Sequence, residues 1–246
     1  MKKQILETFI EKYNLRGEVE ATILVIDSKN TLLSTLTTTP EKCVLVGVKY
    51  NKFDAITSDC NIGIHNTSKL KSMLGVLGED VTIEPNKKAD GTIISLTFND
   101  TSTDVHFVTA DLSVIPKTPT INKLPPFNAE IELTQDFISK FLKAKAALSD
   151  IDTFTVTMNK KNALELFIGN TSTNSNRIKL NVKPVIGKDT VGKSINFSAK
   201  YLKEILNANS ECTDAILQIS DAGLASVRFV SGDFESTYYL VELKGE

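Results

Sequence analysis

The sequence predicts an α+β fold made of two diverged copies of one unit, in which helices pack on antiparallel sheets. Three observations lead to this prediction. Separate segments match at a constant offset of 132 residues, as Ile5 and Phe137 do, and internal matches of this kind indicate a duplicated unit. Both copies show the same order of helical and strand-like patterns. A proline-rich stretch lies between them.

The offset of 132 residues recurs in three parts of the chain. It pairs residues 5–13 with 137–145, 26–32 with 158–164, and 70–74 with 202–206. Each copy then continues with an apolar strand, a glycine turn (Gly91 or Gly223) and two more strands. Few of the paired positions are identical, but three segments in one order at one offset are hard to obtain by chance.

Two helices are predicted in each copy. The first covers 2–14 and 134–148, because apolar residues recur there every three or four positions on one face. The second covers 67–77 and 199–208. The side-chain oxygens of Asn66 or Thr67, and of Ser198, can accept hydrogen bonds from the free N–H groups of the first helical turn, so these residues are expected as N-caps.

Strands fill the rest of each copy. Alternating apolar residues predict strands such as 44–50 and 153–158 between the two helices. Three closing strands follow the second helix, at 80–84, 92–98 and 104–110 in the first copy and at 214–219, 224–230 and 235–242 in the second. The second copy also has a short strand, 129–133, before its first helix.

The stretch 116–126 contains four of the seven prolines in the chain. Proline fixes φ and lacks a backbone donor, so this stretch is predicted to be an extended connector. The predicted organisation is a first domain at 1–115, a connector at 116–128 and a second domain at 129–246.

Composition indicates an ordinary globular protein, with 41% hydrophobic and 24% charged residues. The N-terminal residues do not follow the pattern of a signal peptide, and no apolar run approaches the ~18 residues that span a bilayer. Three cysteines without close spacing suit a reducing compartment. We therefore expect a cytoplasmic location, or the host cytoplasm if a phage encodes the protein.

One motif suggests an alternative function. Residues 187–194 satisfy the pattern G-x-x-x-x-G-K-[ST] of phosphate-binding loops, which would make the protein a nucleotide hydrolase. In that loop the Gly-Lys-Ser opens a helix, whose N–H groups meet the phosphates. Here Ser194 precedes a strand pattern, and the equivalent stretch 54–61 of the first copy has neither glycine nor lysine. A hairpin loop is the preferred interpretation.

Other catalytic groupings are weak. His65 and His106 are the only histidines. With so few histidines, the sequence does not support a Ser-His-Asp triad or a Cys-His pair. Acidic residues are scattered without metal-ligand or glycosidase spacing. We expect no enzyme activity, no metal site and no cofactor.

The charges are distributed unevenly along a chain whose net charge is −2. The four helical spans are all basic: 2–16, 66–77 and 134–149 each carry +2, and 198–209 carries +1. The strands and loops are therefore acidic. Lys140 and Lys143 are three positions apart on one helical face, and Lys200 and Lys203 repeat that spacing. Four basic helices in equivalent positions predict a shared basic surface, although a single such face is usually only solvated.

These features together resemble the DNA polymerase sliding clamp family, which includes the proliferating cell nuclear antigen and the T-even-type phage clamps. The segments 227–230 and 236–240 resemble the terminal strands of those proteins, and 176–180 resembles the edge strand that closes their ring. The resemblance covers essentially the whole chain. The nearly immediate start on a helix is closer to the phage clamps and favours viral replication.

The resemblance implies a processivity factor that encircles double-stranded DNA as a head-to-tail homotrimer, with a DNA polymerase and a clamp loader as partners. Helices would line the hole and contact phosphates without reading sequence, so a net acidic body would be no contradiction. A monomeric processivity factor of the same fold remains an alternative. The implied DNA-facing residues are Lys69, Lys71, Lys140, Lys143, Lys200 and Lys203. Lys3, Lys12 and Arg16 of the first helical span are added to them, although Glu7 and Glu11 on the same span argue against a DNA-facing surface there.

Two further surfaces follow from the resemblance. The ring contact would pair the strand near 104–110 with the strand near 177–182 of the next chain, which removes two exposed sheet edges. Its candidate residues are Val105, Phe107, Arg177, Ile178 and Leu180. Partner peptides would bind an apolar pocket beside the connector, for which the candidates are Ile121, Leu124, Pro125, Val241 and Leu243.

Overall fold

The computed structural model describes residues 1–119, 123–169, 176–212 and 215–243. The chain divides into two compact units. Unit 1 comprises Met1–Pro40, Val46–Pro119 and Val230–Ser236, and unit 2 comprises Glu41–Leu45, Thr120–Phe229 and Thr237–Glu246. Strands β3 (Val44–Asn51) and β16 (Phe234–Val241) are each divided between the units.

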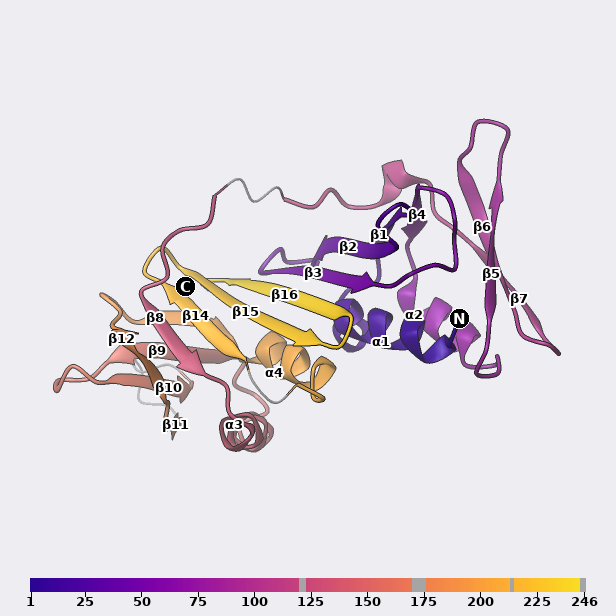
Figure 1. Cartoon of the computed structure of the whole chain (residues 1–246). Helices are drawn as coiled ribbons and strands as arrows, with labels where there is room; N and C mark the ends of the chain where they lie inside the picture. Colours follow the sequence, from indigo (N-terminus) through magenta and orange to yellow (C-terminus); the bar gives the residue numbers. More distant parts are fainter. Residues whose placement is uncertain (120–122, 170–175, 213–214, 244–246) are drawn as a thin grey trace. The chain divides into compact units, whose positions relative to one another are not determined.

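Unit 1 contains two helices and two antiparallel sheets (Figure 1). The helices are α1 (Lys3–Asn14) and α2 (Thr67–Leu74), with the short 3-10 helices η1 (Leu15–Gly17) and η2 (Leu112–Val114). One sheet has the order β3-β2-β1-β4, with β2 at Leu32–Thr38, β1 at Thr22–Asp27 and β4 at Cys60–Ile64. The other has the order β5-β6-β7, with strands at Thr82–Lys87, Ile93–Asn99 and Asp104–Val108.

Unit 2 repeats this arrangement. Its helices are α3 (Gln135–Ala147) and α4 (Ala199–Ala208). A sheet of order β11-β10-β9-β13 consists of Ile178–Leu180, Leu164–Ile168, Thr153–Met158 and Ile195–Ser198. A second series, β12-β8-β14-β15-β16, consists of Pro184–Asp189, Ala129–Glu132, Ile216–Ser220, Leu224–Ser231 and the final strand, β16.

The strand orders confirm the predicted duplicated α+β fold. The order β3-β2-β1-β4 corresponds strand by strand to β11-β10-β9-β13, and β5-β6-β7 corresponds to β14-β15-β16. The helices begin at the predicted offset, since α1 and α3 start at residues 3 and 135 and α2 and α4 at 67 and 199. The glycine turns are also equivalent, because Gly91 and Gly223 adopt φ values of 86° and 82°, a conformation that favours glycine.

Helix ends follow local chemistry. Asn66 Oδ1 accepts a hydrogen bond of 2.8 Å from the backbone N–H of Lys69, and Ser198 Oγ accepts one of 3.2 Å from that of Tyr201. Both predicted N-caps are therefore confirmed. Helix α2 ends at Leu74, three residues before the predicted end, because Gly75 follows it and glycine is a poor helix former.

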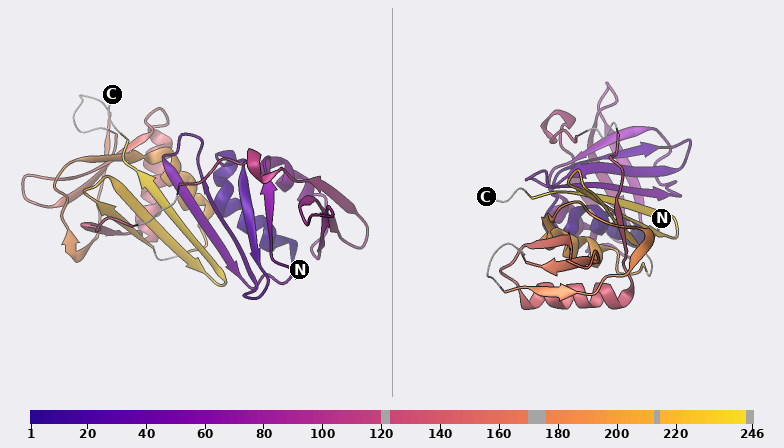
Figure 2. Two further views of the ribbon diagram at one scale, coloured as in Figure 1. Left: turned by 90° about the horizontal axis from the view of Figure 1, so that it is seen from above. Right: turned by 90° about the vertical axis from the view of Figure 1, so that its left-hand side faces the viewer.

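Each unit has its own apolar core. In unit 1, Leu6, Phe9, Ile10 and Tyr13 of α1 are buried, and α1 runs behind the strands of its unit in the left view of Figure 2. In unit 2, four aromatic rings pack in series, with centroid distances of 6.2 Å, 5.9 Å and 5.5 Å for the successive pairs of Phe137, Phe141, Phe154 and Phe197. Such ring contacts add to the free energy of burial.

Two classes of feature are not found in the part of the chain that the structure describes. No helix there is long and apolar enough to cross a membrane. Nor do those residues contain a group of three or more His, Cys, Asp or Glu side chains placed to hold a metal ion.

Replacing Phe141 with alanine tests the aromatic series. Its side chain is fully buried, so Phe141→Ala should lower the free energy of unfolding by about 3–5 kcal/mol through lost burial and the cavity left behind. Urea unfolding followed by circular dichroism measures this loss. Val76→Ala is the control, because Val76 is 65% exposed and should change stability by less than about 0.5 kcal/mol. Equal effects of the two variants would contradict the assigned core.

Candidate nucleic-acid interface

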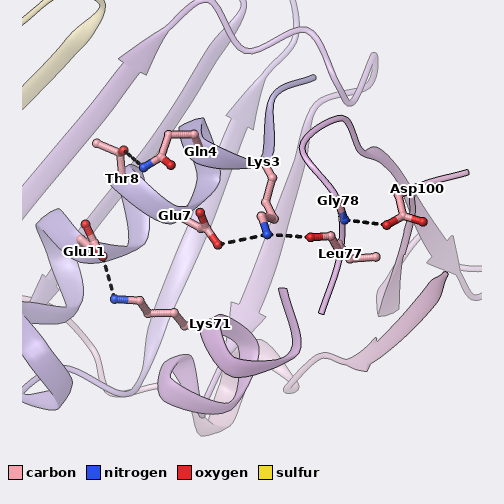
Figure 3. A network of polar contacts seen from close by, with 9 residues as sticks. All are labelled: Lys3, Gln4, Glu7, Thr8, Glu11, Lys71, Leu77, Gly78 and Asp100. Atoms are coloured by element: carbon pink, nitrogen blue, oxygen red, sulfur yellow. Dashed lines mark hydrogen bonds and ion pairs between the residues drawn. The ribbon is translucent and has the colours of Figure 1, made fainter. Parts of the chain in front are cut away.

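Helices α1 and α2 lie side by side in unit 1. Lys69 and Lys71, both predicted to face DNA, are exposed on α2. The ammonium group of Lys71 lies 2.8 Å from Glu11 Oε1 of α1, as Figure 3 shows. Lys69 has no ion-pair or hydrogen-bond partner for its side chain among the described residues.

Helix α1 does not present the basic surface that its sequence suggests. The side chain of Lys12 is 1% exposed, and its Nζ lies 5.8 Å from the ring centroid of Phe234. Lys3 is half-buried and donates a hydrogen bond of 2.7 Å to the carbonyl oxygen of Leu77 (Figure 3). A lysine stem packs readily on apolar neighbours, so net charge along a helix overstates the charge on its surface. We leave Lys12 out of the proposed interface.

In unit 2, the candidate lysines of α3 are more exposed than those of α4. Lys140 and Lys143 are both exposed. Lys140 forms an i,i+4 ion pair of 2.6 Å with Asp136, whereas the Lys143 ammonium group has no partner among the described residues. The candidates on α4 are half-buried: Lys200 Nζ lies 5.2 Å from the ring centroid of Tyr201, and Lys203 Nζ lies 3.4 Å from Glu204.

Lys145 shows that a basic residue of these helices can have a structural role. It is buried and donates to the carbonyl oxygens of Leu148 and Ser149 at 3.4 Å and 2.9 Å, with Asp152 at 3.1 Å. A cation at the C-terminal end of a helix is favourable, because the last carbonyl groups are unpaired and carry partial negative charge. Its ammonium group therefore stabilises the end of α3.

The strands predicted to form the ring contact both end their sheets. Strand β7 is the last of β5-β6-β7, and β11 is the first of β11-β10-β9-β13. The side chains of Val105, Phe107 and Leu180 are buried and that of Ile178 is half-buried. Arg177 is exposed, with its guanidinium carbon 5.9 Å from the ring centroid of Phe167. A contact at these edges would therefore use mainly the backbone, and the ring contact remains a prediction.

No protein-family model matches the chain, and no curated protein matches it. Solved structures do. The proliferating cellular nuclear antigen of Entamoeba histolytica is 16% identical with a TM-score of 0.71, and the match covers 99% of this chain and 96% of that one. The A. fulgidus PCNA, solved with the C-terminal region of FEN-1 bound, is 18% identical with a TM-score of 0.73, and the match covers 100% and 98%.

The chain has the sliding-clamp fold. Both matches run through the two units and the connector, so the duplicated architecture as a whole is shared. Identities of 16–18% leave the roles of individual residues to be argued from the geometry.

In this sliding-clamp fold, the predicted peptide pocket is only partly described. Ile121 lies outside the described residues. Leu124 and Val241 are 38% and 46% exposed, and Pro125 and Leu243 are half-buried. Their apolar surface is available to a partner, and the pocket remains a prediction.

The last residue of β16 and the two residues that follow it are hydrogen-bonded within unit 2. The backbone N–H groups of residues 241, 242 and 243 donate hydrogen bonds of 2.8 Å to the carbonyl oxygens of Cys43, Gly223 and Asn196. Lys193 Nζ lies 2.7 Å from Glu242 Oε2. The lysine of the Gly-Lys-Ser motif therefore anchors the end of the sheet.

The rest of that motif does not have the geometry of a phosphate-binding loop. Residues 190–194 connect β12 to β13, and α4 begins only after the cap Ser198. The backbone N–H of Gly192 donates to Asp221 Oδ1 at 2.8 Å, and the Ser194 hydroxyl lies 2.7 Å from that of Thr157. The groups that would hold a phosphate are directed to protein partners instead. The hairpin interpretation was wrong, because β12 pairs with β8 and β13 pairs with β9, so the loop joins strands of two different sheets.

Nucleotide titrations test the geometry of this loop. We expect neither the wild-type chain nor Lys193→Ala to bind ATP in calorimetric titrations with Mg²⁺ present. Lys193→Ala should lower the thermal midpoint, because it removes the ion pair with Glu242. Lys188→Ala is the matched control within the same motif, since Lys188 pairs instead with Glu130. Saturable ATP binding that is lost in Lys193→Ala and retained in Lys188→Ala would contradict the assignment.

The hydrogen bonds that Asp100 accepts make the stability of the protein depend on pH. Asp100 accepts backbone N–H bonds of 2.6 Å from Gly78, shown in Figure 3, and of 2.7 Å from Ser102 and Thr103. The Gly78 bond is the largest cause that lowers the pKa of Asp100 to about 2. Because the folded pKa lies below the unfolded value of about 3.9, this stabilisation is complete above the unfolded value and is lost as pH falls toward the folded one.

Asp100→Asn should therefore weaken the dependence of stability on pH between about pH 5 and pH 2. Urea unfolding of wild type and variant at several pH values in this range measures the difference. The exposed Asp54 provides the control variant, Asp54→Asn. If Asp100→Asn kept the full wild-type pH dependence, the hydrogen bonds to Asp100 would not be the cause.

Proposed function

We propose that this protein is a DNA sliding clamp, a non-enzymatic processivity factor that encircles duplex DNA in the cytoplasm and tethers a replicative polymerase. The observation that carries the proposal is the whole-chain match to PCNA, which covers 99–100% of this chain and 96–98% of the PCNA chains. A match over the complete duplicated unit, rather than over one sheet, supports the proposal because a ring would need the elements of both copies.

Exposed lysines on two helices, with a half-buried lysine on a third, support sequence-independent DNA binding. Lys69 and Lys71 on α2 and Lys140 and Lys143 on α3 are exposed, and Lys203 on α4 is half-buried. Lysine is a flexible point charge that meets phosphates without fixed geometry. A ring retained by topology needs only weak contacts, so the net charge of −2 is compatible with this role.

The internal repeat supports assembly as a head-to-tail homotrimer. In unit 1, Asn51 N donates to Asp233 O at 2.9 Å, and the Tyr50 and Phe234 rings lie 4.7 Å apart. In unit 2, Val241 N donates to Cys43 O. The ends of β3 and β16 thus lie alongside each other in each unit. Their repeat equivalents are β11 and β7, the two sheet edges, which can pair in the same way between neighbouring chains.

Partners are proposed by the same reasoning. The A. fulgidus PCNA binds the C-terminal region of FEN-1, so this fold can present a surface to a peptide segment. We assign a polymerase and a clamp loader as partners of this chain, with Leu124, Pro125, Val241 and Leu243 as the apolar contact surface.

Retention on DNA of different topology tests the function. The labelled protein is loaded onto nicked circular DNA or onto linear DNA of equal length, and retention is followed by gel filtration in high salt. We expect retention on circles and rapid loss from linear DNA, because a ring is held by topology rather than affinity. Light scattering should give a mass of three chains.

The alternatives give different results in the same experiment. A monomeric processivity factor of this fold would show one chain by light scattering and equal retention on circular and linear DNA. Blocking the ends of the linear DNA is the control, since it should restore retention of a ring. Loss from blocked linear DNA as fast as from open DNA would overturn the proposed function.

A further inference from the structure

Two exposed lysines on the proposed DNA-facing helices already have carboxylate partners. Lys71 Nζ lies 2.8 Å from Glu11 Oε1, with the two side chains 45% and 50% exposed. Lys140 Nζ lies 2.6 Å from Asp136 Oδ2, with the side chains 59% and 73% exposed. One pair joins two helices (Figure 3) and the other lies within α3, so both carboxylates lie on the same helical surfaces as the lysines.

Each of the two helices also offers an internal comparison. Lys69 lies on α2 with Lys71, and Lys143 lies on α3 with Lys140. The ammonium groups of Lys69 and Lys143 have no ion-pair partner among the described residues, and both side chains are exposed. Helices α2 and α3 thus each carry one exposed lysine with a carboxylate partner and one exposed lysine without.

Two other acidic residues, Glu7 and Glu204, lie beside candidate lysines but are less accessible to a ligand. Glu7 lies 3.7 Å from Lys3, whose side chain is 17% exposed and is held by the carbonyl of Leu77. Glu204, beside Lys203, is buried. Neither carboxylate is placed to exchange its partner freely with a ligand in solvent, so the argument concerns Glu11 and Asp136 alone.

An exposed ion pair is weak and opens readily. A DNA phosphate can therefore replace the carboxylate as the partner of Lys71 or Lys140, but the displaced carboxylate stays close by and repels the phosphate. When a lysine is already neutralised by a carboxylate, its binding releases fewer counterions from the DNA. Counterion release is the main source of non-specific affinity. Both effects weaken the contact without removing the lysine.

We propose that Glu11 and Asp136 limit DNA affinity by competing with phosphates for Lys71 and Lys140, and that this keeps the contact weak enough for sliding. This inference rests on the proposed function, because it requires α1, α2 and α3 to face DNA. It assigns the acidic residues of the helices a role in the interface.

The test measures DNA affinity as a function of salt for the full-length chain. A fluorescently labelled duplex is titrated with wild type, Glu11→Gln or Asp136→Asn at 50–200 mM NaCl, and anisotropy reports binding. Each variant should bind more tightly. The slope of log K against log salt should steepen by up to about 0.9 for each lysine released. The gain in DNA affinity over wild type should then be about threefold larger at 50 mM than at 200 mM NaCl.

Three controls isolate the effect. Glu84→Gln removes one negative charge from an exposed position of β5 and should leave binding unchanged. Lys69→Ala and Lys143→Ala should weaken binding and flatten the slope by about 0.9. In a Lys71→Ala background, Glu11→Gln should lose most of its effect, a coupling that a change in net charge alone would not produce.

The outcomes separate the inference from the proposed function. If Glu11→Gln and Asp136→Asn behave like Glu84→Gln while Lys69→Ala and Lys143→Ala weaken binding, the competition is refuted and DNA binding by these helices stands. If neither lysine variant changes binding, both the inference and the proposed interface fall. Thermal midpoints within a degree or two of wild type verify that each variant is folded, since exposed pairs contribute little to stability.

Discussion

Burial of one apolar face on each helix is the constraint on which the other features depend. Phe9 and Tyr13 of α1, whose ring centroids are 5.8 Å apart, fix the rotation of that helix about its axis, and Phe137 and Phe141 do so for α3. Once the rotation is fixed, the helical period decides which side chains reach solvent. Lys143 of α3 is exposed and Lys12 of α1 is buried for this reason.

The duplication was readable in the sequence because it depends on this same periodicity. Apolar spacing and local capping chemistry set the starts of α2 and α4, as the bonds accepted by Asn66 and Ser198 show. The Gly-Lys-Ser loop could also be distinguished from a phosphate-binding loop, since its placement before a strand is visible from the alternating residues that follow Ser194. That the loop joins two sheets rather than forming a hairpin depends on tertiary pairing and was not visible. Local patterns of this kind survive divergence to 16–18% identity with the solved clamps.

The electrostatics of the candidate site could not be read in the same way. Net charge along a span counts Lys12 and Lys145 as surface charges, although one is buried against Phe234 and the other caps α3. The pair between Lys71 and Glu11 joins residues 60 positions apart, and no periodicity within either helix reveals it. Charge pairing across elements depends on tertiary packing, which is why the sequence predicted a more uniform basic surface than the molecule has.

The anchored segment after β16 also has a practical consequence for the design of reporters. Backbone hydrogen bonds from residues 241–243 and the ion pair of Glu242 with Lys193 fix this part of the chain. A fusion partner joined at residue 243 would lie next to these bonds and to the apolar candidates Val241 and Leu243. A dye is better placed at Ala89, which is exposed in the turn between β5 and β6, where conjugation leaves both the helical lysines and the sheet edges untouched.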